Sequence, residues 1–114
     1  MSSRIPEPEA PPAFAAPVFA ALGDPTRLAL IGRLADGRAR SLSELSEGSP
    51  ISRQAVAKHL RVLAGTGIVG SVRAGRETRF ALEPARLAAA RDYLDTVGRQ
   101  WEAALGRLKA HIEG

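Results

Sequence analysis

The last quarter of the sequence reads as one long helix with a continuous apolar stripe. The segment opens at Pro84 and runs to about residue 112, and proline is favoured in the first turn of a helix. The stripe recurs every three or four residues and consists of Leu94, Val97, Trp101, Leu105, Leu108 and Ile112. Unless Gly98 or Gly106 bends it, such a helix is on the order of 43 Å long, more than a small domain can cover. The stripe therefore predicts contact with a second copy of the chain.

The chain length limits the rest of the sequence to one small domain. With 114 residues in all, there is no room for two lobes with an active-site cleft between them. The four prolines within residues 6–12 predict a flexible arm over residues 1–13, followed by a domain over residues 14–114. No run of about 18 apolar residues offers a membrane span, and no basic-then-apolar leader begins the chain. We expect a cytoplasmic protein without a membrane partner.

The residue content argues against catalysis. Cysteine is absent, which removes disulfides, thiolate metal sites and cysteine nucleophiles. The chain has no glycine-rich phosphate loop. Its two histidines, His59 and His111, have no serine or carboxylate partner at a recognisable catalytic spacing. We therefore expect neither an enzyme nor a cofactor, and we assign no catalytic residue.

Start signals divide the middle of the chain into short helices. A first helix begins near residue 14, and Asp24 followed by proline caps a second. A third begins at residue 43, and Ser52 caps a fourth that covers residues 53–64. On the second helix, the apolar spacing predicts a buried face made of Leu28, Ile31, Leu34 and Ala35.

The fourth helix has two different faces. At about 100° per residue, Val56, Leu60 and Leu63 fall on one side and are expected to pack inward. The opposite face is polar and basic and carries no carboxylate. Its residues are Arg53, Gln54, Ala57, Lys58 and Arg61.

Two strands follow the fourth helix. Residues 68–73 and 78–82 alternate as β-strands do, and the Ala-Gly-Arg-Glu of residues 74–77 is a hairpin signal. Arg73 and Arg76 belong to its tip, where we expect Glu77 to orient an arginine, because a carboxylate repels phosphate. The order of elements predicts a mainly α-helical fold with a two-stranded β-wing, which is a winged helix-turn-helix.

The positive charge of the chain lies in its middle. Residues 25–82 carry ten basic and four acidic side chains, a sum of +6, whereas residues 1–24 sum to −2 and residues 83–114 to zero. Most of the cations are arginines, whose planar donor fork suits phosphates and guanine edges. A basic, carboxylate-free helix face beside a basic hairpin predicts binding to DNA.

The same segments resemble the ArsR-type bacterial repressors. The matching stretches are ALGDPTRL at 21–28, LSEL at 42–45, SRQAVAKHLRVL at 52–63, GIV at 67–69 and RAGRE at 73–77. The tail at residues 100–108 is similar to a subgroup often encoded beside a lipid-binding-type (SRPBCC) domain protein. The resemblance implies a homodimer that binds double-stranded operator DNA with a palindromic sequence, usually as a repressor.

In this family the fourth helix enters the major groove, the hairpin approaches the minor groove or backbone, and the first and last helices dimerise. Carried onto this sequence, the resemblance implies DNA contacts by Ser52, Arg53, Gln54, Ala57, Lys58, His59, Arg61, Arg73 and Arg76. It implies a dimer interface formed by Phe14, Phe19, Leu94, Val97, Trp101, Leu105 and Leu108. His59 lies about 60° from the centre of the inward face, so a packed histidine and a DNA contact both stay open. Arg27 is equally open between phosphate and an internal salt bridge.

The family's metal sites do not carry over. Ser46 and Gly48 stand where one family site places two cysteines, and neither is a useful ligand for a soft metal. The other site needs Asp-x-His and His-x-x-Glu, but the residue two positions after Asp92 is Leu94 and the residue three positions after His111 is Gly114. We therefore expect no metal site and place the chain in a subgroup that does not sense metals.

Two other functions remain as alternatives, a winged helix that binds proteins and a metal-responsive repressor. A protein-binding module predicts exposed apolar residues on the fourth helix, where this sequence has polar ones. The small-molecule effector, the operator sequence and the regulated genes stay unknown at this point.

Overall fold

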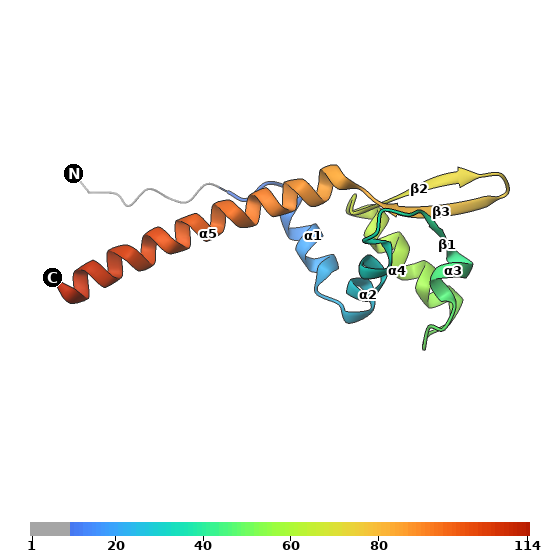
Figure 1. Cartoon of the computed structure of the whole chain (residues 1–114), viewed down its shortest axis with the longest axis horizontal. Coiled ribbons are helices and arrows are strands. Elements are labelled where there is room, and N and C mark those ends of the chain that lie inside the picture. Colours follow the sequence, from blue (N-terminus) through green and yellow to red (C-terminus); the bar gives the residue numbers. More distant parts are fainter. Residues whose placement is uncertain (1–9) are drawn as a thin grey trace.

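The computed structural model describes residues 10–114. Residues 1–9 of the predicted arm lie outside the described residues, and residues 10–13 form neither helix nor strand. The described chain has this order of elements: α1 (Ala15–Leu22), α2 (Pro25–Leu34), β1 (Arg40–Ser41), α3 (Leu42–Ser46), α4 (Arg53–Gly65), β2 (Val69–Ala74), β3 (Glu77–Leu82) and α5 (Pro84–Glu113). The four shorter helices form the body, while α5 and the β2–β3 hairpin extend from it in opposite directions (Figure 1).

The predicted helix caps are confirmed. The Asp24 carboxylate accepts the backbone N–H of Arg27 at 3.0 Å, and the Ser52 hydroxyl accepts that of Ala55 at 3.1 Å. α3 begins one residue earlier than expected because Ser41 caps it. The Ser41 hydroxyl accepts the backbone N–H of Glu44 while the Glu44 carboxylate accepts that of Ser41, so two free donors at the helix start are satisfied together.

The hydrophobic core lies between α1, α2, α4 and the base of the hairpin. The predicted inward face of α4 is confirmed, since Val56, Leu60 and Leu63 are all buried. The predicted face of α2 is partly wrong, because Leu28 is 51% exposed and Leu30 is buried in its place; Ala35, which caps the end of the helix, is exposed as well. Positions i and i+2 of a helix point about 200° apart, so burial of Leu30 turns Leu28 toward solvent.

The sheet contains one strand more than the hairpin. β2 and β3 pair antiparallel from Val69↔Leu82 to Ala74↔Glu77, and Gly75 at φ 64 supplies the left-handed residue of the turn. β1 pairs with β3 through Arg40↔Phe80 and Ser41↔Arg79, giving the order β1-β3-β2. The predicted wing is therefore joined at its base to the start of α3 by a third strand that the sequence did not predict.

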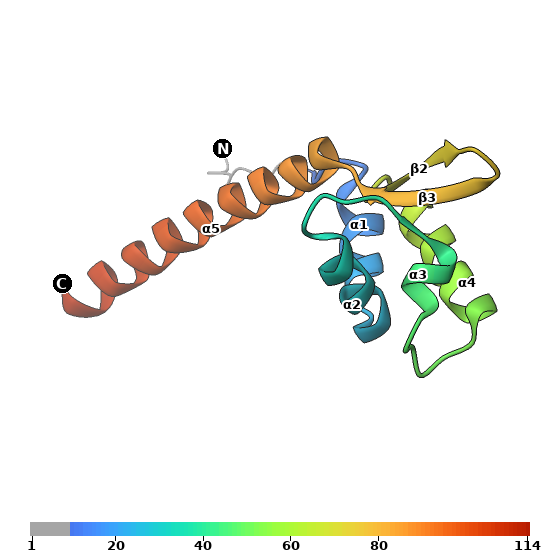
Figure 2. The same ribbon diagram turned by 45° about the vertical axis from the view of Figure 1, so that its right-hand side comes forward.

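The long helix is continuous, as α5 runs through Gly98 and Gly106 without interruption. Its first turns pack on the body, with Ala90 buried, and the remainder projects away from it in both views (Figure 2). On the projecting part, Leu94 is 54%, Trp101 65% and Ile112 73% exposed. Among the helices of residues 10–114, none is both long and apolar enough to cross a membrane.

Candidate nucleic-acid interface

The outer face of α4 is polar, basic and open to solvent. Arg53, Gln54, Lys58 and Arg61 are exposed and Ala57 is half-buried, on the side opposite the buried Val56, Leu60 and Leu63. The N-terminal residue Ser52 is exposed as well, although its hydroxyl already accepts from Ala55. This face therefore offers an amide and several cations without a carboxylate to repel phosphate.

His59 does not belong to this outer face. It is half-buried, and its Nδ1 lies 3.4 Å from Arg27 Nη1 and 3.9 Å from Asp24 Oδ2. Arg27 is itself engaged within the chain, since its Nε donates to the Ala21 carbonyl at 2.7 Å. The backbone N–H of Arg27, and then its charge and that of His59, lower the pKa of the Asp24 carboxyl. The structure thus favours the packed interpretation of His59 and the internal one of Arg27.

The wing carries its arginines in two different situations. Arg73 and Arg76 are exposed near the tip, where the Nε of Arg73 donates to the Gly75 carbonyl at 3.2 Å. Arg79 lies nearer the base and pairs with Glu77 at 3.1 Å and with Glu44 at 3.8 Å. The predicted role of Glu77 in orienting an arginine is confirmed, and Arg79 is the residue it orients.

A groove of about 270 Å³ joins the wing to the helix-turn-helix. Its lining includes Arg53 from the first turn of α4, Arg76 and Glu77 from the wing, and Ser41 and Ser43 from the start of α3; the Glu77 carboxylate is paired with Arg79. Two cations from separate elements thus face one groove. This convergence links the two basic segments that the sequence placed 23 positions apart.

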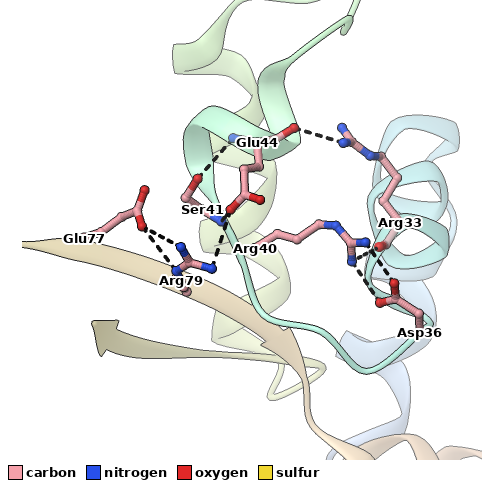
Figure 3. Close-up of polar contacts among 7 residues, drawn as sticks. All are labelled: Arg33, Asp36, Arg40, Ser41, Glu44, Glu77 and Arg79. Carbon is pink, nitrogen blue, oxygen red and sulfur yellow. Dashed lines mark hydrogen bonds and ion pairs between the residues drawn. The ribbon is translucent and has the colours of Figure 1, made fainter. Parts of the chain in front are cut away.

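Several other arginines of the middle block hold the fold together, which charge counting did not reveal (Figure 3). Arg33 donates to the carbonyls of Leu45 and Glu44 at 2.8 and 2.9 Å, which secures the end of α3 to α2. Arg40 forms a double contact with Asp36, both at 2.8 Å, and holds the pKa of that carboxyl far below its usual range. The four-residue spacing of this pair was its signal in the sequence.

The electrostatics at α3 follow from the same network. The backbone N–H and hydroxyl of Ser41 lower the pKa of Glu44, aided by the charge of Arg79. Arg27, Arg33, Arg40 and Arg79 have partners on other parts of the chain. The remaining exposed cations of the middle block are therefore Arg38, before β1, and the five on α4 and the wing.

The residues predicted for a dimer interface fall into two groups. Phe14 and Phe19 are half-buried and contact α5 of the same chain, Phe14 beneath the Arg86 guanidinium at 4.9 Å and Phe19 against the Tyr93 ring at 6.0 Å. The apolar stripe, including Leu94, Val97, Trp101, Leu105 and Leu108, lies exposed on the projecting part of α5.

The residues at the two family metal positions are not arranged as metal ligands. The Ser46 hydroxyl donates to the Leu42 carbonyl at 2.7 Å, and His111 is exposed in the last turns of α5. Over residues 10–114, no three histidine, cysteine or acidic side chains converge as a metal site requires.

Comparison with known proteins matches this chain to transcriptional regulators. A family model described as a helix-turn-helix domain matches residues 22–72. The HTH-type transcriptional regulator Rv2034 of Mycobacterium tuberculosis is 42% identical over 85 residues, covering 75% of this chain and 76% of that protein. An ArsR-like transcriptional regulator from Rhodococcus sp. RHA1 has a TM-score of 0.76 at 40% identity, over 86% of this chain and 92% of that one. A homodimeric winged helix-turn-helix DNA-binding domain from Mycobacterium bovis shares the fold, with a TM-score of 0.60 at 21% identity over 75% of this chain and 78% of that one.

Proposed function

This chain belongs to the ArsR-like family of helix-turn-helix transcriptional regulators, and from that premise we propose that it is a repressor that binds a palindromic operator as a homodimer. α4 is its recognition helix, and the outer face of α4 reads the major groove. The observation that carries the proposal is the groove between Arg53 and Arg76, because it lets one DNA duplex engage the recognition helix and the wing together.

The exposed side chains of the recognition helix suit base reading. The amide of Gln54 can make two hydrogen bonds to adenine, and the guanidinium of Arg61 can do the same with guanine. Lys58 lies between them and provides a point charge for either a guanine edge or a phosphate. Arg53, Arg73 and Arg76 contact the DNA backbone, where they fix the position of the helix without reading the sequence.

The apolar stripe on α5 supplies the dimer interface. Six large apolar side chains exposed in one row, on a helix that projects from its own domain, favour burial against another apolar surface. The buried Ala90 lies on the same side of α5 as the stripe. The surface covered by the body of the chain and the surface offered to a partner are therefore continuous.

The spacing of the stripe favours an antiparallel pair of α5 helices. Its members form three pairs, 94/112, 97/108 and 101/105, whose midpoints all lie within half a residue of Ala103. Two helices running in opposite directions therefore place Trp101 against the partner's Leu105. On one flank of the stripe, Asp95 then lies one turn or less from Lys109 of the partner subunit, which is a favourable pairing of charges. This arrangement puts the two winged domains at opposite ends of the pair, as two half-sites on one duplex require.

Repression without a metal completes the proposal. No pair of ligands occupies the family's metal positions, so a metal ion is not the signal that releases the protein from its operator; a small-molecule effector at the dimer interface and repression of its own operon without an effector both stay open. The experiment is footprinting of the purified full chain on the region upstream of its own gene. We expect protection of two symmetric half-sites about one helical turn, 34–36 Å, apart, and lower reporter expression when the protein is present. Uniform, sequence-independent protection would contradict a specific operator, and raised expression would contradict repression.

A further inference from the structure

A polar cluster joins α1, α2 and α4 on the side of the recognition helix that the proposed DNA contacts do not use. Arg27 is at its centre. Its Nε donates to the Ala21 carbonyl at 2.7 Å and its Nη2 to the Ala20 carbonyl at 3.5 Å, both at the end of α1. Its Nη1 lies 3.4 Å from Nδ1 of His59 on α4. Asp24 accepts the backbone N–H of Arg27 and lies 3.9 Å from the same imidazole nitrogen.

The chemistry of the two side chains fixes the direction of the contact between Arg27 and His59. A guanidinium has five donors and no acceptor, so Arg27 donates to His59 when the imidazole is neutral, with Nδ1 accepting and the ring proton on Nε2. The planar fork of arginine can reach the carbonyls of α1 and the imidazole of α4 at once, whereas the ammonium of a lysine cannot span both. The contact is therefore specific for the two residue types that the chain has here.

We propose that Asp24, Arg27 and His59 are positioning residues that set the orientation of the recognition helix against α1 and α2. The inference rests on the proposed function, in which α4 reads DNA. The inward face of α4 holds to the core through aliphatic contacts of Val56, Leu60 and Leu63, which are not directional. A hydrogen bond on the flank of the helix is directional, and it restrains the rotation that would move Gln54 and Lys58 away from the bases.

Two substitutions of His59 separate positioning from direct contact with DNA. In His59→Asn, the side-chain oxygen occupies the place of Nδ1 and still accepts from Arg27. In His59→Gln, the amide nitrogen replaces Nε2 while the acceptor at Nδ1 is lost. If His59 acts through Arg27, the Asn variant keeps the wild-type ratio of operator to random-DNA affinity and the Gln variant lowers it about tenfold, a change of about 1.4 kcal/mol. The opposite pattern, or an equal loss in both variants, overturns the proposal.

A second substitution tests the other end of the contact. Arg27→Lys keeps the charge and should lower the same ratio by about as much as His59→Gln. Arg99 is exposed on the side of α5 opposite the apolar stripe. Arg99→Lys is therefore the matched control and should leave the ratio unchanged. The thermal unfolding temperature of each variant shows whether the domain is still folded. A lower ratio in a variant that unfolds at the wild-type temperature reflects a changed helix orientation rather than loss of the fold. A specificity ratio that Arg27→Lys leaves intact contradicts the proposal.

Nitrogen NMR of the free protein tests the contact without DNA. At a pH where His59 is neutral, the imidazole should carry its proton on Nε2, and Arg27→Lys should shift the Nδ1 resonance. If no duplex is preferred but the tautomer is as expected, the proposed function fails and the contact stands. If an operator is bound specifically but the tautomer is reversed, the positioning role fails and the proposed function stands.

Discussion

Removing the Arg76 side chain should lower the affinity for DNA of any sequence without changing which sequence is preferred. Arg76 is exposed at the wing tip, so its loss removes a cation from the DNA backbone and no base contact. Each phosphate neutralised by a protein cation lowers the slope of log affinity against log salt by about 0.9. On α4 and the wing, each protomer has five exposed basic residues, namely Arg53, Lys58, Arg61, Arg73 and Arg76.

The magnitude follows from that count. With Arg61 on a guanine edge and the other four on phosphates, the slope for a dimer is about −7.2, and Arg76→Ala makes it about −5.4 because both protomers lose one contact. Between 50 and 200 mM salt, a fourfold change, the wild-type protein should lose about twelve times more affinity than the variant does. Random DNA and operator should show the same difference in slope.

The assay is fluorescence anisotropy with operator and random duplexes over a series of salt concentrations. Gln54→Ala is the complementary variant, because a neutral amide leaves the slope unchanged while its loss costs about 1–3 kcal/mol at the base it reads. Arg99→Ala on the outer side of α5 is the control and should alter neither quantity. The assignment of roles is refuted if Arg76→Ala changes the sequence preference while Gln54→Ala changes only the slope.

Three further results are expected. Trp101→Asp should convert a dimer at micromolar concentration into a 12.0 kDa monomer in light scattering, because an unpaired carboxylate in an apolar interface is strongly unfavourable; a wild-type chain that is already monomeric would refute the α5 interface. Zinc, cadmium, arsenite, nickel or a chelator should leave operator affinity unchanged in anisotropy, and a tenfold shift, about 1.4 kcal/mol, would reveal a metal site. Since the folded-state pKa of Glu44 is lowered from 4.5, its contribution to stability is present above about pH 4.5 and is lost as pH falls through the folded-state value. Glu44→Gln should therefore flatten the acid limb of stability measured by urea unfolding, and an unchanged limb would contradict this role.

The parts of the fold that local chemistry controls were predictable from the sequence. Asp24 and Ser52 mark helix starts because a short oxygen-bearing side chain must reach a backbone N–H two or three residues later. Gly75 in the hairpin turn was predictable as well, because the turn requires a left-handed backbone that glycine adopts readily. The polar and buried faces of α4 follow from helical periodicity alone, since both faces are well populated.

The parts that depend on distant partners were not predictable. β1 is too short to show alternation, and its pairing partner Phe80 lies 40 positions later. Arg27 and Arg33 bind backbone carbonyls at helix ends, which have no residue-type signature, so charge counting assigned them to the DNA-facing surplus. Leu28 and Leu30 were both acceptable core residues by composition, and only the packing of α2 against its neighbours decides between them.

The long helix α5 has a mechanical consequence. Its first turns are held to the body by Leu87 and the buried Ala90 and by the contacts of Arg86 with Phe14 and of Tyr93 with Phe19. The 20 residues from Leu94 to Glu113 extend about 30 Å beyond. A tilt of about 10° at the root moves the far end by about 5 Å, roughly one and a half base-pair steps. α5 is therefore a lever whose pivot is its packed first turns. In the proposed dimer, a small rotation at that pivot therefore produces a larger change in the distance between the two recognition helices.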